Sequence, residues 1–142
     1  MLILPQPFVT ALIALQFVAF GWRINREITV GDGRRKTWLP LPDYLNLASL
    51  IVVTLSCVVM PLVNRPCPRT ALVALSVGYV MMAFHPISEA AHYRLFSKLG
   101  RSKYIEQGKD YPWITGQEIG FVTISVIFAV LAGWFAFTGF SK

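Results

Sequence analysis

The stretch TALVALSVGYVMMAFHPISEAAHYRLF, residues 70–96, decides the fold of this chain. Residues 70–84 are almost entirely apolar, whereas the remainder carries ionisable side chains. His85, Glu89 and His92 follow one another at i, i+4 and i+7, so a helix would place all three on one side. An apolar run that ends in charged groups is typical of a membrane-spanning helix that reaches the membrane–water interface. Charged groups at that position are candidates for a functional site.

Similar apolar runs occur elsewhere in the chain. A sequence of 142 residues that is 55% hydrophobic, with a mean hydropathy of +0.56, is too apolar for a soluble domain of this size. Each run is close to the roughly 20 residues that cross about 30 Å of hydrocarbon as a helix. Such long continuous runs exclude the strands of a barrel. We therefore predict one all-α domain, a polytopic bundle of four transmembrane helices at about residues 2–22, 43–63, 70–96 and 116–140.

The basic residues predict how this bundle is oriented. The loops after the first and third runs each contain five Lys or Arg, whereas the loop after the second contains two. Because cytoplasmic loops carry the excess of basic residues, the first and third loops should be cytoplasmic and both termini outside, in a bacterial inner membrane. This bias also explains the formal net charge of +6, so no nucleic-acid partner is implied.

This orientation gathers polar residues from several helices in the inner leaflet. The second and fourth runs begin on the cytoplasmic side and the third ends there. Asp43 is expected to cap the second helix. Gln16, a strongly polar residue within the first run, could face another helix, and we expect it to pack in the core. The residues predicted at this depth are Asp43, Asn46, His85, Glu89, His92, Tyr93, Gln117 and Glu118.

Three interpretations of this layer remain open. The layer could line a pocket for an anionic or lipophilic ligand, with basic side chains around its mouth. His85, Glu89 and His92 could bind zinc, iron or manganese, because imidazole and carboxylate suit these ions. Their spacing is not a familiar metal signature, and Asp43 or Glu118 would have to complete the site, so no metal ligand is assigned. Alternatively, Glu89 pairs with a histidine and Arg94 at an ordinary helix end. As ligand-binding residues we predict Asn46, His85, Glu89, His92, Tyr93, Arg94 and Glu118.

Several local patterns resemble the MAPEG superfamily, the membrane-associated proteins in eicosanoid and glutathione metabolism. A basic helix end at Arg23 leads into Val-Gly-Asp-Gly, residues 30–33, as in bacterial members. The family motif Arg-Ala-x-x-Asn-x-x-Glu corresponds to the segment 42–49, where the asparagine matches as Asn46. Tyr93-Arg94, and Gly-Phe-Val-Thr at 120–123, are also similar to the family pattern.

The resemblance implies a homotrimer with glutathione bound between subunits at the cytoplasmic end, and a transferase-like or isomerase-like activity on a lipophilic substrate. Pro42 and Ser49 replace the arginine and the glutamate of the motif, two residues expected to hold glutathione. A divergent member with another ligand, or with none, therefore fits better than a glutathione transferase.

A function of a different class is also open. The chain could be a non-catalytic accessory subunit of a larger membrane complex, in which small residues and a nearly featureless outer half form packing surfaces. An enzyme or ligand-binding protein should be stable as a homo-oligomer, whereas an accessory subunit should co-purify with partner membrane subunits.

Overall fold

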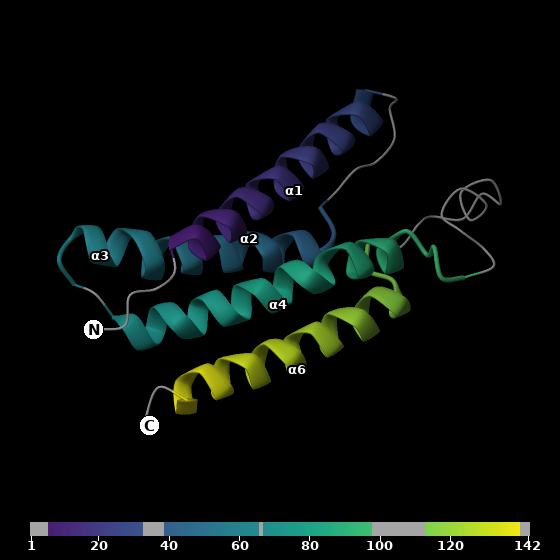
Figure 1. Cartoon of the computed structure of the whole chain (residues 1–142). Helices are drawn as coiled ribbons and strands as arrows, with labels where there is room; N and C mark the ends of the chain where they lie inside the picture. Colours follow the sequence, from purple (N-terminus) through teal and green to yellow (C-terminus); the bar gives the residue numbers. More distant parts are fainter. Residues whose placement is uncertain (1–5, 33–38, 66, 98–112, 140–142) are drawn as a thin grey trace.

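The computed structural model describes residues 6–32, 39–65, 67–97 and 113–139. Within these residues the chain is all-α and forms four long helical segments (Figure 1). The segments are α1 (Gln6–Asp32), a continuous rod of α2 (Leu41–Thr54), η1 (Leu55–Val59) and α3 (Met60–Leu62), then α4 (Pro68–His92) and α6 (Gly116–Gly139). The predicted all-α four-helix bundle is therefore confirmed.

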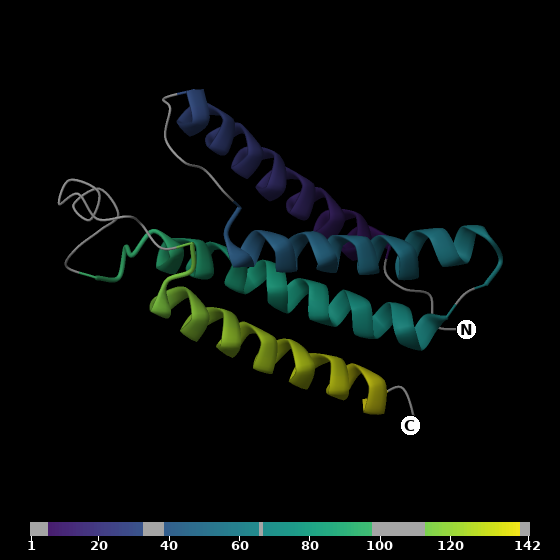
Figure 2. The ribbon, with the colours of Figure 1, turned by 180° about the vertical axis from the view of Figure 1, so that it is seen from behind.

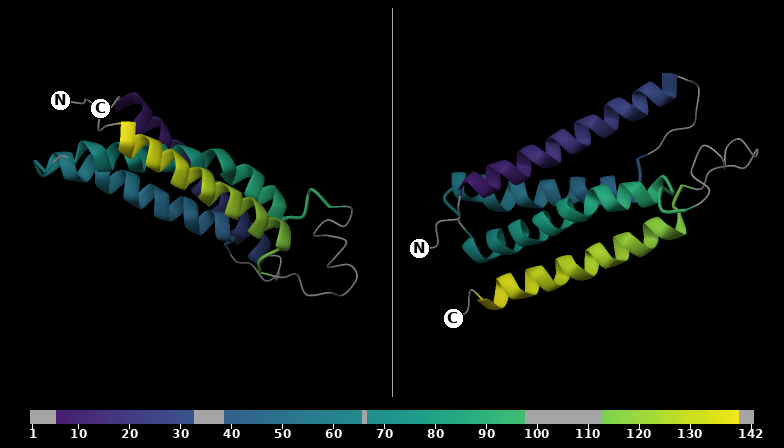
Figure 3. Two further views of the ribbon diagram at one scale, coloured as in Figure 1. Left: turned by 90° about the horizontal axis from the view of Figure 1, so that it is seen from below. Right: turned by 45° about the vertical axis from the view of Figure 1, so that its right-hand side comes forward.

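The helices are arranged with α4 in the middle. It packs against α2 on one side and against α6 on the other, and α1 crosses over α2 and α4. Figures 2 and 3 show the same arrangement from other sides, with the end of α1 leaning away from the other helices. The start of α1 and the end of α6 lie at one end of the bundle. The start of α2, the end of α4 and the start of α6 meet at the opposite end.

All four segments are long and apolar enough to cross a membrane. The candidate spans are Gln6–Thr29, Leu41–Leu62, Pro68–His92 and Gly116–Gly139. The shortest has 22 residues, which at about 1.5 Å per residue covers roughly 33 Å. Large apolar side chains point outward, as on a lipid-facing surface: Val18 and Phe135 are each 70% exposed. The chain is a small multi-pass membrane protein.

The first and third spans end at other residues than the sequence predicts. The first span was predicted to end at about residue 22, but the candidate span continues to Thr29 and α1 to Asp32. The third helix ends at His92 rather than near residue 96. The basic strip at 34–36 and most of the polar loop before the fourth span lie outside the described residues.

A π-helical turn lies in the second half of the second span. It covers Leu55–Val59, and Pro61 follows two residues after it, inside the span. Proline has no backbone N–H and its ring crowds the carbonyl four residues earlier. We attribute the wider turn to this crowding, because a π-turn accommodates a local defect in the hydrogen-bond ladder without ending the helix. The span ends at Leu62, and Asn64 then has a positive φ of 56°, which asparagine tolerates.

Three helices meet at Gly78 in the middle of α4. A Cβ atom built there would lie 2.8 Å from Leu12 Cδ2 of α1 and 2.9 Å from Val53 Cγ2 of α2. Both neighbours are fully buried, so neither side chain can move into free space. Only glycine allows α1 and α2 to approach α4 this closely.

Gly78→Ala is therefore expected to reduce the free energy of unfolding by about 1–3 kcal/mol, the usual cost of overpacking an interior. Gly120→Ala is the matched control in α6, because a Cβ atom there meets nothing within 4 Å. Unfolding of the purified protein in mixed micelles, followed by circular dichroism, measures both. Equal stability of the two variants would contradict the close approach at Gly78.

Candidate functional site

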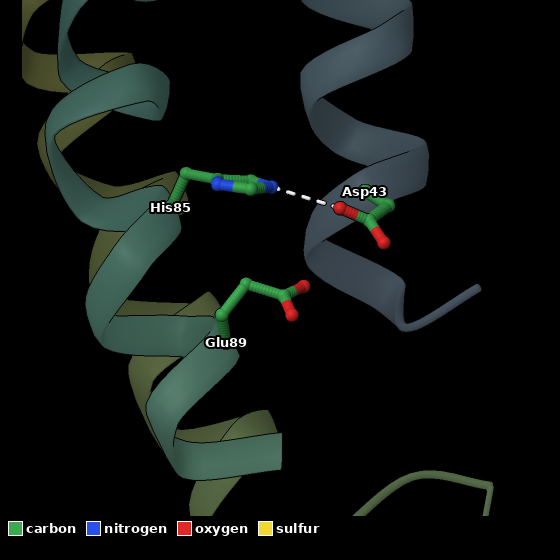
Figure 4. A group of neighbouring side chains, drawn as sticks. All are labelled: Asp43, His85 and Glu89. Atoms are coloured by element: carbon green, nitrogen blue, oxygen red, sulfur yellow. Dashed lines mark hydrogen bonds and ion pairs between the residues drawn. The ribbon is translucent and has the colours of Figure 1, made fainter. Parts of the chain in front are cut away.

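Four ionisable side chains gather where α1, α2 and α4 meet, and we call Arg23, Asp43, His85 and Glu89 the charged cluster. Arg23 Nε donates a hydrogen bond to Asp43 Oδ2 at 2.9 Å and lies 3.3 Å from Glu89 Oε2. Asp43 Oδ1 lies 2.9 Å from His85 Nε2. Figure 4 shows the imidazole of His85 directed at Asp43, with the carboxylate of Glu89 below them on the same side of α4.

Arg23 is the centre of this cluster, and its side chain is completely buried. Besides Asp43 and Glu89 it contacts Glu27, where Nη2 lies 3.1 Å from Oε1, and Nη1 donates to the hydroxyl of Tyr93. Three carboxylates thus surround one guanidinium. Arginine suits this place because its planar group presents five N–H donors to several acceptors at once.

From the sequence, Arg23 was predicted to lie at the end of the first span and not inside the bundle. A signal for its burial was nevertheless present. Val9, Leu12, Gln16 and Arg23 recur at helical spacing on one face, and all four are buried in the structure. The face continues past the apolar run because α1 itself continues, so an arginine that marks a membrane boundary in the sequence lies inside the bundle.

Asp43 does not cap the second helix, contrary to prediction. The N-cap residue is Pro40, without a side-chain hydrogen bond, and Asp43 lies in the first turn of α2. Its side chain is completely buried and turned toward α1 and α4. The prediction was wrong because the pattern of an acidic residue at a helix start is the same for a cap and for an inward-facing ion pair.

His92 and Glu118 form a second polar group, separate from the charged cluster. His92 Nδ1 lies 2.8 Å from Glu118 Oε2, and the backbone N–H of Leu41 donates to Glu118 Oε1 at 3.0 Å. Thr115 and Glu118 also form a capping box, in which the Thr115 N–H donates to Glu118 Oε2 and the Glu118 N–H donates to Thr115 Oγ1. The Thr-x-x-Glu pattern at 115–118 would have revealed this box. It joins the start of α2, the end of α4 and the start of α6.

A third polar group lies deeper in the bundle. Gln16 Nε2 of α1 donates to Asn46 Oδ1 at 3.2 Å and to Ser49 Oγ at 3.0 Å, both on α2. Gln16 was expected to pack in the core, and it is fully buried there. Asn46, predicted as a ligand-binding residue, is thus engaged with α1.

A small recess adjoins this group and the charged cluster. The volume in which the centre of a water molecule fits there is about 10 Å³. The recess therefore has room for about one water. Its lining residues are Pro42, Leu45, Asn46, Met81, His85, Ser88, Val122 and Ser125.

The two remaining predicted residues lie at the end of α4. Tyr93 stacks beside the guanidinium groups of Arg23 and Arg26, at 5.4 and 5.0 Å from its ring centre. Arg94 follows the last turn with a φ of 55°, and the Leu95 N–H donates to the carbonyl of Ala90 at 2.9 Å. This is the bond that closes a Schellman motif, so Arg94 terminates the helix. Glu89 pairs with Arg23, not with Arg94 as one interpretation supposed.

The structure thus divides the predicted polar layer into distinct groups. His85 and Glu89 join Asp43, and these three each offer a ligand atom, all within 4.8 Å of one another. Among the described residues, His92 and Glu118 belong to the capping network instead. Glu89 differs from the other members, because both of its carboxylate oxygens are buried without a hydrogen-bond partner, and Oε2 has an ion pair with Arg23.

No family model, curated protein or solved structure matches the chain. A functional hypothesis has to come from the contacts and charges just described. The charged cluster is the strongest source for it, since ionisable groups within membrane spans are costly and usually serve a function.

Proposed function

We propose that this chain is a four-span protein of the bacterial inner membrane that binds a small cation at the charged cluster. The observation that carries the proposal is the excess of carboxylates around Arg23. Asp43, Glu89 and Glu27 all contact this one guanidinium, so carboxylates outnumber the arginine in a poorly solvated place. A cation would relieve that excess.

The same contacts argue against an anionic ligand inside one chain. An anion would have to displace carboxylates from Arg23, whose donors already serve Asp43, Glu27 and Tyr93. The recess beside His85 also has room for about one water, far less than glutathione needs. A small cation fits the carboxylates of the charged cluster better than an anion does.

Thermal unfolding of the purified protein in lipid nanodiscs tests this proposal. Divalent metal chlorides, an alkylammonium salt and glutathione are added one at a time. A ligand at 100 times its Kd raises the free energy of unfolding by about 2.7 kcal/mol. We expect at least one cation to stabilise the wild-type protein, to lose its effect in Glu89→Gln and to retain it in the control Arg26→Gln. Stabilisation by glutathione alone would overturn the proposal.

The resemblance to the MAPEG superfamily suggests another arrangement, with the ligand between chains of a homotrimer. The four spans and the buried Asn46 at the inner end support it. Native mass spectrometry in detergent separates the alternatives. A trimer that retains glutathione would favour the MAPEG-like function, and stable co-purification with other membrane proteins would favour an accessory subunit.

The orientation proposed from the basic loops places the charged cluster at the cytoplasmic side. Reporter fusions at Lys142 and near Gly33 are expected to report outside and inside, respectively, because the loops after the first and third spans hold most of the Lys and Arg. A cytoplasmic signal from the fusion at Lys142 would place the cluster in the outer leaflet.

A further inference from the structure

Three residues of the charged cluster combine an imidazole with two carboxylates. Asp43, His85 and Glu89 each offer one ligand atom, and all of these atoms lie within 4.8 Å of one another. With metal–ligand distances of about 2.1 Å, Asp43 Oδ1 and His85 Nε2 at their separation of 2.9 Å would be adjacent ligands at about 90°. The Glu89 carboxylate, which lies within 4.8 Å of both atoms, would be the third ligand.

The second observation is the unsatisfied carboxylate of Glu89. The residue is 8% exposed, and neither carboxylate oxygen has a hydrogen-bond partner. Oε2 has the ion pair with Arg23 Nε at 3.3 Å, whereas no ion pair of Oε1 is found among the described residues. Buried carboxylate oxygens without partners carry a large desolvation cost. Figure 4 shows this carboxylate on the side of α4 that faces Asp43.

Carboxylates outnumber the arginine in the charged cluster and its surroundings, because Asp43, Glu89 and Glu27 all contact the single guanidinium of Arg23. A divalent ion would add positive charge next to Asp43 and Glu89. We propose that Asp43, His85 and Glu89 bind one divalent first-row transition-metal ion such as Zn²⁺ or Mn²⁺, ions that accept imidazole and carboxylate ligands. This inference rests on the proposed cation binding and specifies the cation.

The contact of Arg23 with Asp43 would orient one of the metal ligands. Arg23 holds Asp43 through Oδ2 and leaves Oδ1 toward His85, the kind of outer contact that orients a metal ligand. Three protein ligands would leave a coordination position for water, and such open sites are found in catalytic rather than purely structural metal centres.

Metal analysis of the protein in nanodiscs tests this proposal. The wild-type protein is stripped with a chelator, loaded with Zn²⁺ or Mn²⁺, desalted and measured by inductively coupled plasma mass spectrometry. We expect about one ion per chain, and at least ten-fold weaker retention in Glu89→Gln and His85→Ala. His92→Gln is the matched control and should retain the ion, because His92 contacts Glu118 in the capping network.

A second measurement needs no variant. Co²⁺ added to the stripped wild-type protein should produce visible absorption bands of a nitrogen- and oxygen-ligated ion, and Zn²⁺ should remove them. The proposal is wrong if the wild-type protein retains no ion, or if His92→Gln loses the ion as fully as His85→Ala does. If an alkylammonium ion stabilises the protein through Glu89 while no metal is retained, the metal site fails and the broader cation-binding function survives.

Discussion

Arg23→Met is expected to lower the free energy of unfolding by about 3–5 kcal/mol, the usual cost of breaking a buried ion pair from one side. Methionine keeps much of the volume but removes the positive charge. Asp43 and Glu89 would then remain buried together, and like charges without a counter-ion strongly disfavour the folded state. Unfolding in mixed micelles, followed by circular dichroism, measures the loss.

Two further variants make this experiment specific to the cluster. Arg26→Met is the matched control one turn along α1. Arg26 is exposed, so its removal should cost no more than about 1 kcal/mol. Adding Asp43→Asn to Arg23→Met removes the carboxylate charge that would be left without its arginine. The double variant should therefore recover part of the lost stability. A loss below about 1 kcal/mol for Arg23→Met would show that the three carboxylates do not depend on the guanidinium.

Glu118→Ala is expected to produce the second large effect, a loss of about 3 kcal/mol or more. The change removes the acceptor of the Leu41 and Thr115 N–H groups and the partner of His92. Each buried polar group left without a partner costs about 1–3 kcal/mol. The effect should also appear as faster hydrogen exchange at the starts of α2 and α6, since both starts are held by this one side chain.

Two neighbouring substitutions test that explanation. Glu118→Gln keeps an acceptor oxygen and should lose about half as much stability as Glu118→Ala. Gln117→Ala, one position earlier in α6, should have little effect, because nothing in the capping network depends on its side chain. If Gln117→Ala and Glu118→Ala lose the same free energy of unfolding, the substitutions destabilise α6 itself and not the contact among the three helices.

The sequence predicts the helices well because membrane spans follow from length and hydropathy alone. The predicted spans 70–96 and 116–140 correspond to α4 and α6, which differ from them only by a few residues at the ends. Where the third helix stops was missed, because the left-handed conformation of Arg94 is not encoded by a glycine. The π-turn before Pro61 was missed for a similar reason, since it is a local response to crowding within an otherwise regular helix.

The site was predictable only in part. His85 and Glu89 share a helix face that the spacing reveals, and they do lie together. Arg23 and Asp43 were assigned to a membrane boundary and to a helix cap, because each local pattern is ordinary by itself. Their pairing depends on how α1 crosses α2, a long-range contact with no signature within either segment. Glu118 is a different case, because the local Thr-x-x-Glu pattern at 115–118 predicts the capping box that turns Glu118 toward the start of its own helix.

The burial of Arg23 also bears on the biosynthesis of the chain. During synthesis α1 emerges before the helices that carry Asp43 and Glu89, so its arginine enters the bilayer with Glu27 but without these two carboxylates, at a free-energy cost for the isolated helix. Asp43 follows only 20 residues later, in the next helix. We expect α1 to remain at the insertion machinery until α2 arrives, so that the two helices leave it as a hairpin and α4 docks afterwards.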